Sequence, residues 1–201
     1  MAIATVPSHA EAVAARVARF RQRMAKEGVD LALFYSNGQH SLLAGDPVFW
    51  ISGFKPMGPH SLVLMPKGGP VTLITTPSWE QDRAREQSPL DKVIASDDFG
   101  AAVAQAVAEG KLSSARAGLS GQRRLDRYAR DLINGQFASA PAQFEAVYDD
   151  EAKSRDAYEI ELARRATAVA EGAYQHMLRV ARIGMPEYEL SAEIVAYTKE
   201  N

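Results

Sequence analysis

The alternation of short apolar runs with amphipathic segments constrains the fold of residues 8–135 more than any other feature. Short apolar runs suit strands, whereas apolar residues at intervals of three and four suit helices. The predicted strands span residues 31–35, 48–51, 61–65, 71–75, 92–95 and 115–119. The predicted helices span residues 8–28, 37–45, 77–87, 97–110 and 122–134. This order predicts an α/β domain with a mixed sheet and flanking helices.

Local signals support this assignment. Ser8 and Glu11 have the spacing of a capping box at the start of the first helix, and Gly28 suits the left-handed turn that ends it. Residues 66–70, Pro-Lys-Gly-Gly-Pro, separate two apolar runs and so predict a β-hairpin. Residues 31–35 are apolar throughout, which predicts a strand that is buried on both faces.

The pattern changes near Ala142, where strand signals stop. Residues 155–182 can form one long helix, which Gly184 interrupts before Pro186 opens a second. The long helix carries a continuous apolar stripe, formed by Leu162, Ala166, Val169, Ala173, Met177 and Val180.

This stripe needs a partner surface. We interpret residues 1–145 as a whole α/β domain and residues 150–201 as the start of a second domain that continues beyond Asn201. On this interpretation the stripe packs against residues outside 1–145. In the alternative, the two helices pack on the α/β domain of the same chain.

The composition narrows the classes of function. The chain of 201 residues has a formal net charge of −2, with 46% hydrophobic and 24% charged residues, as in ordinary globular proteins. That charge argues against a protein that binds nucleic acid through bulk charge. The absence of cysteine excludes disulfides, thiol catalysis and cysteine-ligated metal sites. Because no membrane-spanning run or secretory signal is visible, we expect a cytoplasmic protein without nucleic-acid or membrane partners.

Catalytic and metal-binding motifs are missing from the sequence. Residues 66–69 lack the spacing of a phosphate-binding loop, and residues 118–121 lack that of a nucleophile elbow. The four histidines are far apart, and none belongs to a metal-binding spacing. The motifs therefore single out no catalytic residue, metal ligand or cofactor in this chain.

The stretch Trp50–His60 is a candidate for binding. It combines Trp50 and Phe54 with Lys55 and His60 in a loop that two prolines stiffen. Aromatic and polar side chains on a rigid scaffold are typical of binding sites, and Lys55 and His60 offer donors to a substrate carboxylate. Alternatively, Trp50 and Phe54 belong to the core and the loop only connects two elements.

Several segments resemble the creatinase/prolidase family. In the N-terminal part these are residues 16–24, RVARFRQRM, residues 28–33, GVDLAL, and residues 51–54, where the family commonly has a Tyr-Leu-Thr-Gly-Phe segment. In the C-terminal part, the start of the family's catalytic domain is similar to Lys153-Ser154, Glu159-Ile160, Arg164-Arg165-Ala166 and residues 184–190, GMPEYEL. The resemblance covers nearly the whole chain, and the motifs follow the family's order and spacing.

The resemblance implies a ribonuclease-H-like N-terminal domain followed by the first helices of a pita-bread catalytic domain. Most such enzymes cleave the bond before proline with two divalent metal ions, and Mn, Co or Zn would serve the parent enzyme; creatinase instead hydrolyses a guanidino compound without metal. The catalytic residues of the parent enzyme would lie beyond this chain. The chain would serve homodimer formation and shape the entrance for a peptide or a small guanidino or amide substrate, with Trp50, Phe54, Lys55 and His60 as entrance residues.

One difference from the family limits the possible substrate, and two other functions are alternatives to the hydrolase hypothesis. Creatinase-type loops carry a substrate-binding Arg near the position of Gly58, so Gly58 argues against creatine as the substrate. A free-standing binding or scaffold module is the alternative function, and it predicts that the apolar stripe is covered within this chain. A nuclease of ribonuclease-H-like topology would need carboxylates for metal ions, and residues 31–35, 48–51 and 61–65 carry none.

Overall fold

The structure is a computed structural model that describes residues 6–39 and 45–201. The chain divides into two compact units. The α/β unit comprises Ser8–Ser154, and the helical unit comprises Arg155–Asn201, with which the described residues Val6 and Pro7 group. None of the helices in the described ranges is long and apolar enough to cross a membrane.

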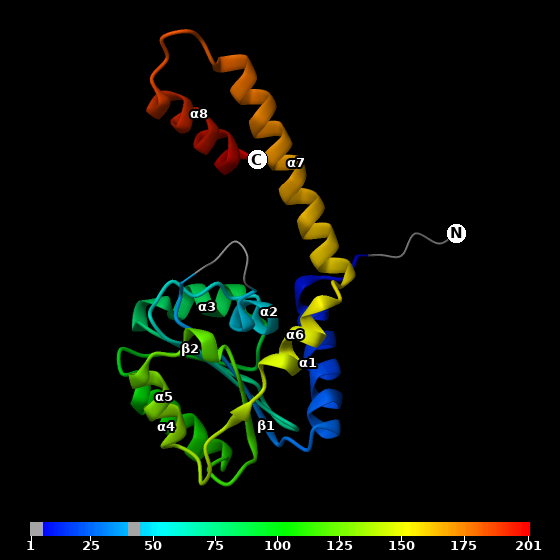
Figure 1. Ribbon diagram of the computed structural model, residues 1–201, viewed down its shortest axis with the longest axis vertical. Coiled ribbons are helices and arrows are strands. Elements are labelled where there is room, and N and C mark those ends of the chain that lie inside the picture. The colour runs from blue at the N-terminus through cyan, green and yellow to red at the C-terminus, as the bar shows by residue number, and fades with distance from the viewer. Residues whose placement is uncertain (1–5, 40–44) are drawn as a thin grey trace, which may run out of the picture. The chain divides into compact units, whose positions relative to one another are not determined.

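The α/β unit is built on a sheet of six strands in the order β4-β3-β2-β1-β5-β6. Its adjacent strands β1 and β2 are labelled in Figure 1. β2 is antiparallel to both of its neighbours, and the other neighbouring strands are parallel. The strands are β1 (Leu31–Ser36), β2 (Ser61–Pro66), β3 (Thr72–Thr75), β4 (Lys92–Ala95), β5 (Ala117–Ser120) and β6 (Ala142–Gln143). The predicted α/β class, mixed sheet and β2–β3 hairpin are therefore confirmed.

Helices cover both faces of this sheet. One face packs against α4 (Phe99–Gly110) and α5 (Arg127–Asn134). The other face packs against α1 (His9–Lys26), α2 (Pro47–Ser52), α3 (Gln81–Gln87) and α6 (Glu145–Lys153). Leu33 of β1 belongs to the first core and Phe34 to the second, and both side chains are fully buried. The prediction that β1 is buried on both faces is confirmed.

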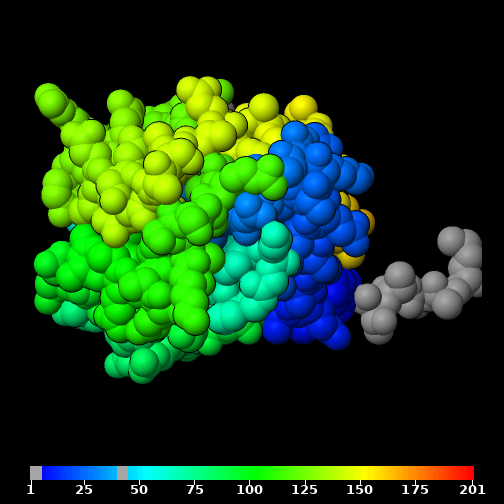
Figure 2. Space-filling view, turned by 90° about the horizontal axis from the view of Figure 1, so that it is seen from below, coloured from blue at the N-terminus to red at the C-terminus, as the bar shows by residue number. Residues whose placement is uncertain are grey.

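The first helix begins and ends as its sequence predicts. Both hydrogen bonds of the capping box between Ser8 and Glu11 are present at the start of α1. Gly28 follows the helix with a φ of 66°, a left-handed conformation that glycine adopts without strain. Arg21 of α1 donates to the carbonyl oxygen of Pro66 at 3.1 Å and so fixes the β2–β3 hairpin beside the helix. Figure 2 shows this hairpin in cyan next to α1 in blue.

The prediction of a strand at residues 48–51 is wrong, because these residues belong to helix α2. Asp46 caps α2 by accepting a hydrogen bond from the backbone N–H of Phe49 at 3.0 Å. Pro47 occupies the first turn, and Gly53 ends the helix with a φ of 71°. Start and stop signals of a helix therefore flank the short apolar run and decide its conformation.

Other boundaries also differ from the prediction. Of the predicted helix at residues 37–45, residues 37–39 are not helical and residues 40–44 lie outside the described part of the chain. The predicted helix at residues 122–134 is divided into the short 3-10 helix η2 (Gln122–Arg124) and α5, because Asp126 caps α5 through a 2.7 Å hydrogen bond from the backbone N–H of Ala129. The predicted helix at residues 77–87 likewise consists of the 3-10 helix η1 (Ser78–Glu80) followed by α3. β6 and α6 were not predicted.

The helical unit is a hairpin of α7 (Ala157–Val180) and α8 (Glu187–Glu200), as predicted. His176 of α7 stacks on Tyr197 of α8 with ring centroids 5.3 Å apart, and its Nε2 lies 2.9 Å from Glu193 Oε2. Ala173 is the one buried residue of α7 and α8, both of which the structure describes throughout. Leu162 of the apolar stripe is 40% exposed. The two helices by themselves therefore leave most of the stripe accessible.

Candidate functional site

The carboxyl edge of the sheet gathers the polar and aromatic residues of the candidate site. β1, β3, β4 and β5 run parallel, so their carboxyl ends meet at one edge, where the antiparallel strand β2 begins. In α/β sheets this edge is the usual place for ligands. The candidate stretch Trp50–His60 leads directly into β2, and therefore its last residues lie at this edge.

His60 is the centre of this arrangement. Its Nδ1 lies 2.8 Å from the hydroxyl oxygen of Tyr35, the penultimate residue of β1. The imidazole stacks on Phe99 with a centroid distance of 5.0 Å and faces Tyr128 at 5.7 Å. The backbone N–H of Thr76 donates to the carbonyl oxygen of His60 at 3.0 Å. Four segments that are distant in sequence thus hold one histidine.

His60 lines an open cavity of about 510 Å³. Its walls include Pro59, His60, Thr76, Asp97, Asp98, Phe99 and Tyr128. Asp97 accepts hydrogen bonds from the backbone N–H and the hydroxyl of Ser78, which lower the pKa of its carboxyl. The cavity therefore combines aromatic surface, one imidazole and an ionised carboxylate.

Burial controls the protonation of the central pair. Desolvation lowers the pKa of His60, and the nearby carboxylate of Asp126 opposes this effect without cancelling it. Burial also raises the pKa of Tyr35 far above its ordinary value, so its hydroxyl keeps its proton. A hydroxyl that donates to Nδ1 of a neutral imidazole leaves Nε2–H as a donor. His60 is thereby suited to donate a hydrogen bond from an uncharged ring.

The start of the loop is anchored by α3. Phe54 is fully buried, and the guanidinium of Arg83 lies over its ring at 4.7 Å. Arg83 also donates to the carbonyl oxygen of Lys55 at 2.9 Å and pairs with the carboxylate of Glu80, which is itself fully buried. These contacts fix the backbone at Lys55 while its side chain stays exposed.

The middle of the loop passes so close to other backbone segments that it requires glycine. A Cβ atom on Gly58 would lie 1.6 Å from the carbonyl oxygen of Thr76, and one on Gly38 would lie 2.2 Å from that of Gly58. A side chain at position 58 would therefore displace the backbone that follows β3. This packing gives a physical reason for glycine at position 58.

The structure separates the four predicted entrance residues into two pairs. Trp50 and Phe54 lie in the core, and the ring of Trp50 contacts Tyr148 in an edge-to-face arrangement at 5.6 Å. His60 lies outside the core at the carboxyl edge, and Lys55 is exposed beside Arg83 of α3. Tyr35, Phe99 and Tyr128 were not predicted from the sequence, since only the sheet topology brings them to His60. For Tyr35 and Phe99 one signal was available, since Tyr35 ends the predicted strand 31–35 and Phe99 closely follows the predicted strand 92–95.

Exposed apolar side chains mark the same edge. Among the described residues of the α/β unit, the exposed large apolar side chains are those of Phe49, Met57, Trp79 and Tyr128. Met57 precedes β2, Trp79 follows β3 and Tyr128 follows β5, so all three lie in segments at the carboxyl edge. Trp79 is 65% exposed and Met57 67%. Apolar surface of this kind is characteristic of interaction sites.

The described residues include no group of three or more His, Asp or Glu side chains that could hold a metal ion. The carboxylates near His60 have other partners, because Asp98 and Asp126 cap α4 and α5. The geometry therefore supports recognition through hydrogen bonds and apolar contact.

A family model described as the creatinase/prolidase N-terminal domain matches residues 16–147. The chain belongs to this family. Because the match covers β1 to β6, the expected N-terminal α/β fold of the creatinase/prolidase kind is confirmed. No protein with a curated description matches the chain in sequence.

Solved structures show the same fold. An X-Pro aminopeptidase from Thermotoga maritima MSB8 matches with a TM-score of 0.73 and 23% identity over 92% of this chain and 49% of its own. The prolidase from Pyrococcus horikoshii OT3 matches with a TM-score of 0.67 and 20% identity over 93% of this chain and 49% of its own. The chain thus spans about half the length of these proteins.

A shorter structure delimits the creatinase/prolidase N-terminal domain itself. That domain of an X-Pro dipeptidase from Streptococcus pyogenes matches over 98% of its length and 68% of this chain, with a TM-score of 0.55 and 13% identity. The two longer proteins match more than nine-tenths of the chain, which is more than the α/β unit contains. Their likeness therefore extends into the α7–α8 hairpin.

Proposed function

We propose that this chain is the N-terminal, non-catalytic part of a creatinase/prolidase-like hydrolase, and that its carboxyl sheet edge shapes the substrate entrance of that enzyme and takes part in a homodimer. The parent activity that we propose is cleavage of Xaa-Pro dipeptides or of a related C–N bond in a guanidino or amide compound. Family membership and the likeness to prolidase structures support this proposal. The two divalent metal ions of such an enzyme, Mn, Co or Zn, would bind outside the described residues. We also propose that the protein is located in the cytoplasm.

The main support for the entrance role is that two features occur together at the carboxyl edge of the sheet. His60 lies on a wall of the 510 Å³ cavity, where burial lowers its pKa and favours the uncharged ring, and Met57, Trp79 and Tyr128 expose apolar surface in segments at the same sheet edge. An apolar patch with a few fixed polar groups is the usual composition of a small-molecule or protein contact. The anchored backbone at Lys55 lowers the entropy cost of such a contact.

Within this proposal, the two pairs of predicted entrance residues have different roles. His60 and Lys55 would donate hydrogen bonds to a carbonyl or carboxylate of the substrate. Phe54 and Trp50 would hold the loop from the core side, since both are buried. The proposal therefore predicts that the first pair affects substrate binding and the second pair affects folding.

Steady-state kinetics of the enzyme that carries this domain tests the entrance role. His60→Ala and Lys55→Ala should each raise KM several-fold with little change in kcat, the pattern expected when substrate contacts away from the reacting bond are removed. Lys67→Ala is the matched control, because Lys67 is an exposed lysine of the hairpin at the other end of β2. If both loop variants behave like Lys67→Ala, the entrance role is wrong.

Two further measurements test the other parts of the proposal. The 201-residue chain should not hydrolyse Xaa-Pro dipeptides or guanidino compounds when Mn²⁺, Co²⁺ or Zn²⁺ is added, and turnover by this chain would contradict its non-catalytic role. For the dimer, sedimentation of Trp79→Asp should show a larger monomer fraction than the parent protein, because a charge replaces an exposed indole. An unchanged sedimentation profile would remove Trp79 from the interface.

A further inference from the structure

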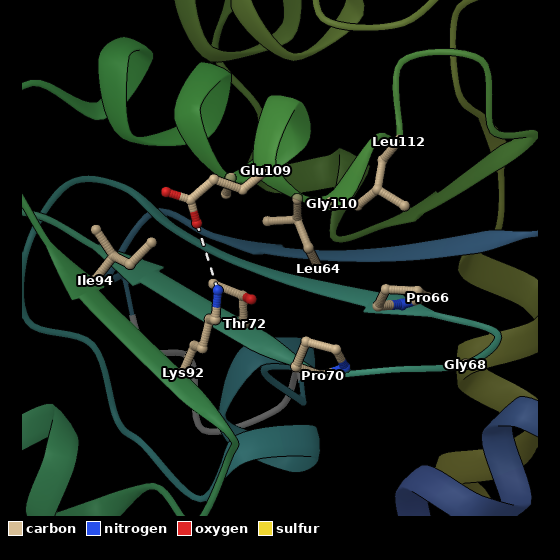
Figure 3. A pocket seen from close by; sticks show the side chains of 11 residues that line it. Leu64, Pro66, Gly68, Pro70, Thr72, Lys92, Ile94, Glu109, Gly110 and Leu112 are labelled. Atoms are coloured by element: carbon tan, nitrogen blue, oxygen red, sulfur yellow. Dashed lines mark hydrogen bonds and ion pairs between the residues drawn. The ribbon is translucent and has the colours of Figure 1, made fainter.

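A second cavity lies at the opposite end of the sheet from His60. It has a volume of about 300 Å³ and lies between the β2–β3 hairpin, β4 and the carboxyl end of α4 (Figure 3). Its apolar wall is formed by Leu64, Pro66, Pro70, Ile94, Ala106 and Leu112. This volume and mainly aliphatic lining are those of a site for a small molecule.

Two opposite charges stand at this cavity. Lys92 from β4 and Glu109 from α4 point toward each other, with Nζ and Oε2 3.4 Å apart (Figure 3). The two side chains are 50% and 48% exposed. An exposed ion pair of this length contributes little stability, so a ligand can separate it at small cost.

The same pair borders a neighbouring hollow of about 440 Å³. Lys92, Ile94 and Glu109 line both spaces. A ligand that separates the pair therefore finds room on either side of it. Glu109 also accepts a hydrogen bond from Gln105 at 2.8 Å, which keeps its carboxylate in place when Lys92 turns toward a ligand.

The charges decide which ligand fits. A simple aliphatic carboxylate would pair with Lys92 but be repelled by Glu109, and a simple amine would meet the reverse conflict. A zwitterion satisfies both charges. The carboxyl end of α4, at Glu109 and Gly110, adds partial negative charge that favours the ammonium group.

We propose that this cavity binds a small aliphatic zwitterion, namely a free α-amino acid with an apolar side chain. Its carboxylate pairs with Lys92 and its ammonium group with Glu109, while its side chain packs against Leu64, Ile94 and Leu112. This site is separate from the carboxyl edge, so the inference does not depend on the entrance role proposed above.

Titration of the isotopically labelled 201-residue chain with L-leucine, followed by amide chemical shifts, tests the proposal. We expect saturable shifts around Lys92, Glu109 and Leu112 with a dissociation constant on the order of 1 mM, as for a ligand of this size at ordinary efficiency. Leucinamide lacks the carboxylate, 4-methylpentanoate lacks the ammonium group and glycine lacks the side chain. Each should bind about tenfold more weakly, which is the effect of losing one charge-assisted hydrogen bond or the apolar contact.

Variants distinguish recognition of both charges of the zwitterion from nonspecific binding. Lys92→Gln and Glu109→Gln should each weaken leucine binding about tenfold, and the exchange Lys92→Glu with Glu109→Lys should restore most of it, because one charge of each sign remains. Lys111→Gln, next to the cavity but outside its lining, should leave binding unchanged. The proposal is overturned if leucine causes no saturable shifts, or if leucinamide and 4-methylpentanoate bind as tightly as leucine.

Discussion

The α/β unit and the α7–α8 hairpin use similar amphipathic helices but achieve different degrees of burial. In the α/β unit, six helices cover two faces of one sheet, and strands such as β1 are buried throughout. In the hairpin, two helices bury Ala173 and leave Leu162, Leu178 and Tyr188 exposed. An apolar stripe therefore closes a core only where enough elements share it. The α/β unit should carry nearly all the stability of this chain.

Separating the two units should give the largest effect. We expect a fragment of residues 1–154 to unfold cooperatively with a melting temperature within a few degrees of the whole chain, and to be the more soluble of the two. A fragment of residues 155–201 should be largely unfolded, because short helices without a shared core are marginal in water. Circular dichroism melts of the three samples make the comparison. A cooperative transition of the 155–201 fragment would show that the hairpin is stable alone.

Substitutions of apolar side chains sharpen the same contrast. Phe20 is fully buried and contacts the rings of Phe34, Trp50 and Phe144 at 4.9, 6.0 and 6.0 Å. Phe20→Ala should lower the free energy of unfolding by about 3–5 kcal/mol. Leu178→Ala, at a side chain that is 54% exposed, should cost less than about 1 kcal/mol.

Urea unfolding followed by tryptophan fluorescence measures both values. If Phe20→Ala and Leu178→Ala lower the free energy of unfolding equally, the predicted effect of their different burial is wrong. A large loss for Leu178→Ala alone would mean that the hairpin face is covered in solution, for instance in a dimer.

The sequence predicted the parts of the fold that depend on local signals. The Ser8–Glu11 capping box and the turn at residues 66–70 each set one boundary by themselves, and both are confirmed. The wrong prediction of a strand at residues 48–51 arose because it relied on the apolar run and ignored the residues on either side. Asp46, Pro47 and Gly53 carry the start and stop signals of a helix, and their combined effect outweighs the preference of four apolar residues for a strand.

The candidate site was less predictable, since its geometry comes from topology. His60 was found because it ends a loop braced by prolines, but Tyr35, Phe99 and Tyr128 each lie at least 25 positions away in sequence. No local pattern links residues that the ends of different strands bring together. The same limit explains Trp50 and Phe54, whose burial depends on α1, α3 and α6 packing over them.

Ion pairs give a smaller contrast between the units. In the α/β unit, Arg124 Nη1 lies 2.8 Å from Asp46 Oδ2, with side chains 13% and 7% exposed. In the hairpin, Arg165 Nε lies 3.1 Å from Glu161 Oε1, with side chains 73% and 27% exposed. Arg124→Met should cost about 2–4 kcal/mol because it leaves a buried carboxylate with fewer partners. Arg165→Met should cost at most about 0.5 kcal/mol.

Urea midpoints at low and high salt distinguish these two cases. Because salt screens exposed charges more than buried ones, the small cost of Arg165→Met should vanish at high salt while that of Arg124→Met persists. If Arg124→Met lowers the stability no more than Arg165→Met does, Arg124 is not a structural partner of buried Asp46.

The smallest effect concerns the two stacked histidines, His60 on Phe99 and His176 on Tyr197. Burial lowers the pKa of His60 below the value of about 6.5 that an unfolded chain gives it. The unfolded state then binds the proton more tightly, so the stability from neutral His60 is complete above that value and falls as the pH drops below it. His60→Gln should remove this acid sensitivity, whereas His176→Gln, in the other unit, should leave it in place.

Urea midpoints at pH 7.5 and 5.0, measured for the parent protein and both histidine variants, test this prediction. The stability that the parent protein loses between these pH values should be smaller than the loss caused by Arg124→Met. Asp126→Asn provides the sharper check. Asparagine still caps α5, so the helix keeps its start, but the carboxylate that favours protonated His60 is gone. The pKa of His60 should then fall further, and the loss of stability between pH 7.5 and 5.0 should grow. If Asp126→Asn reduces that loss instead, the pH dependence comes from Asp126 rather than from the burial of His60.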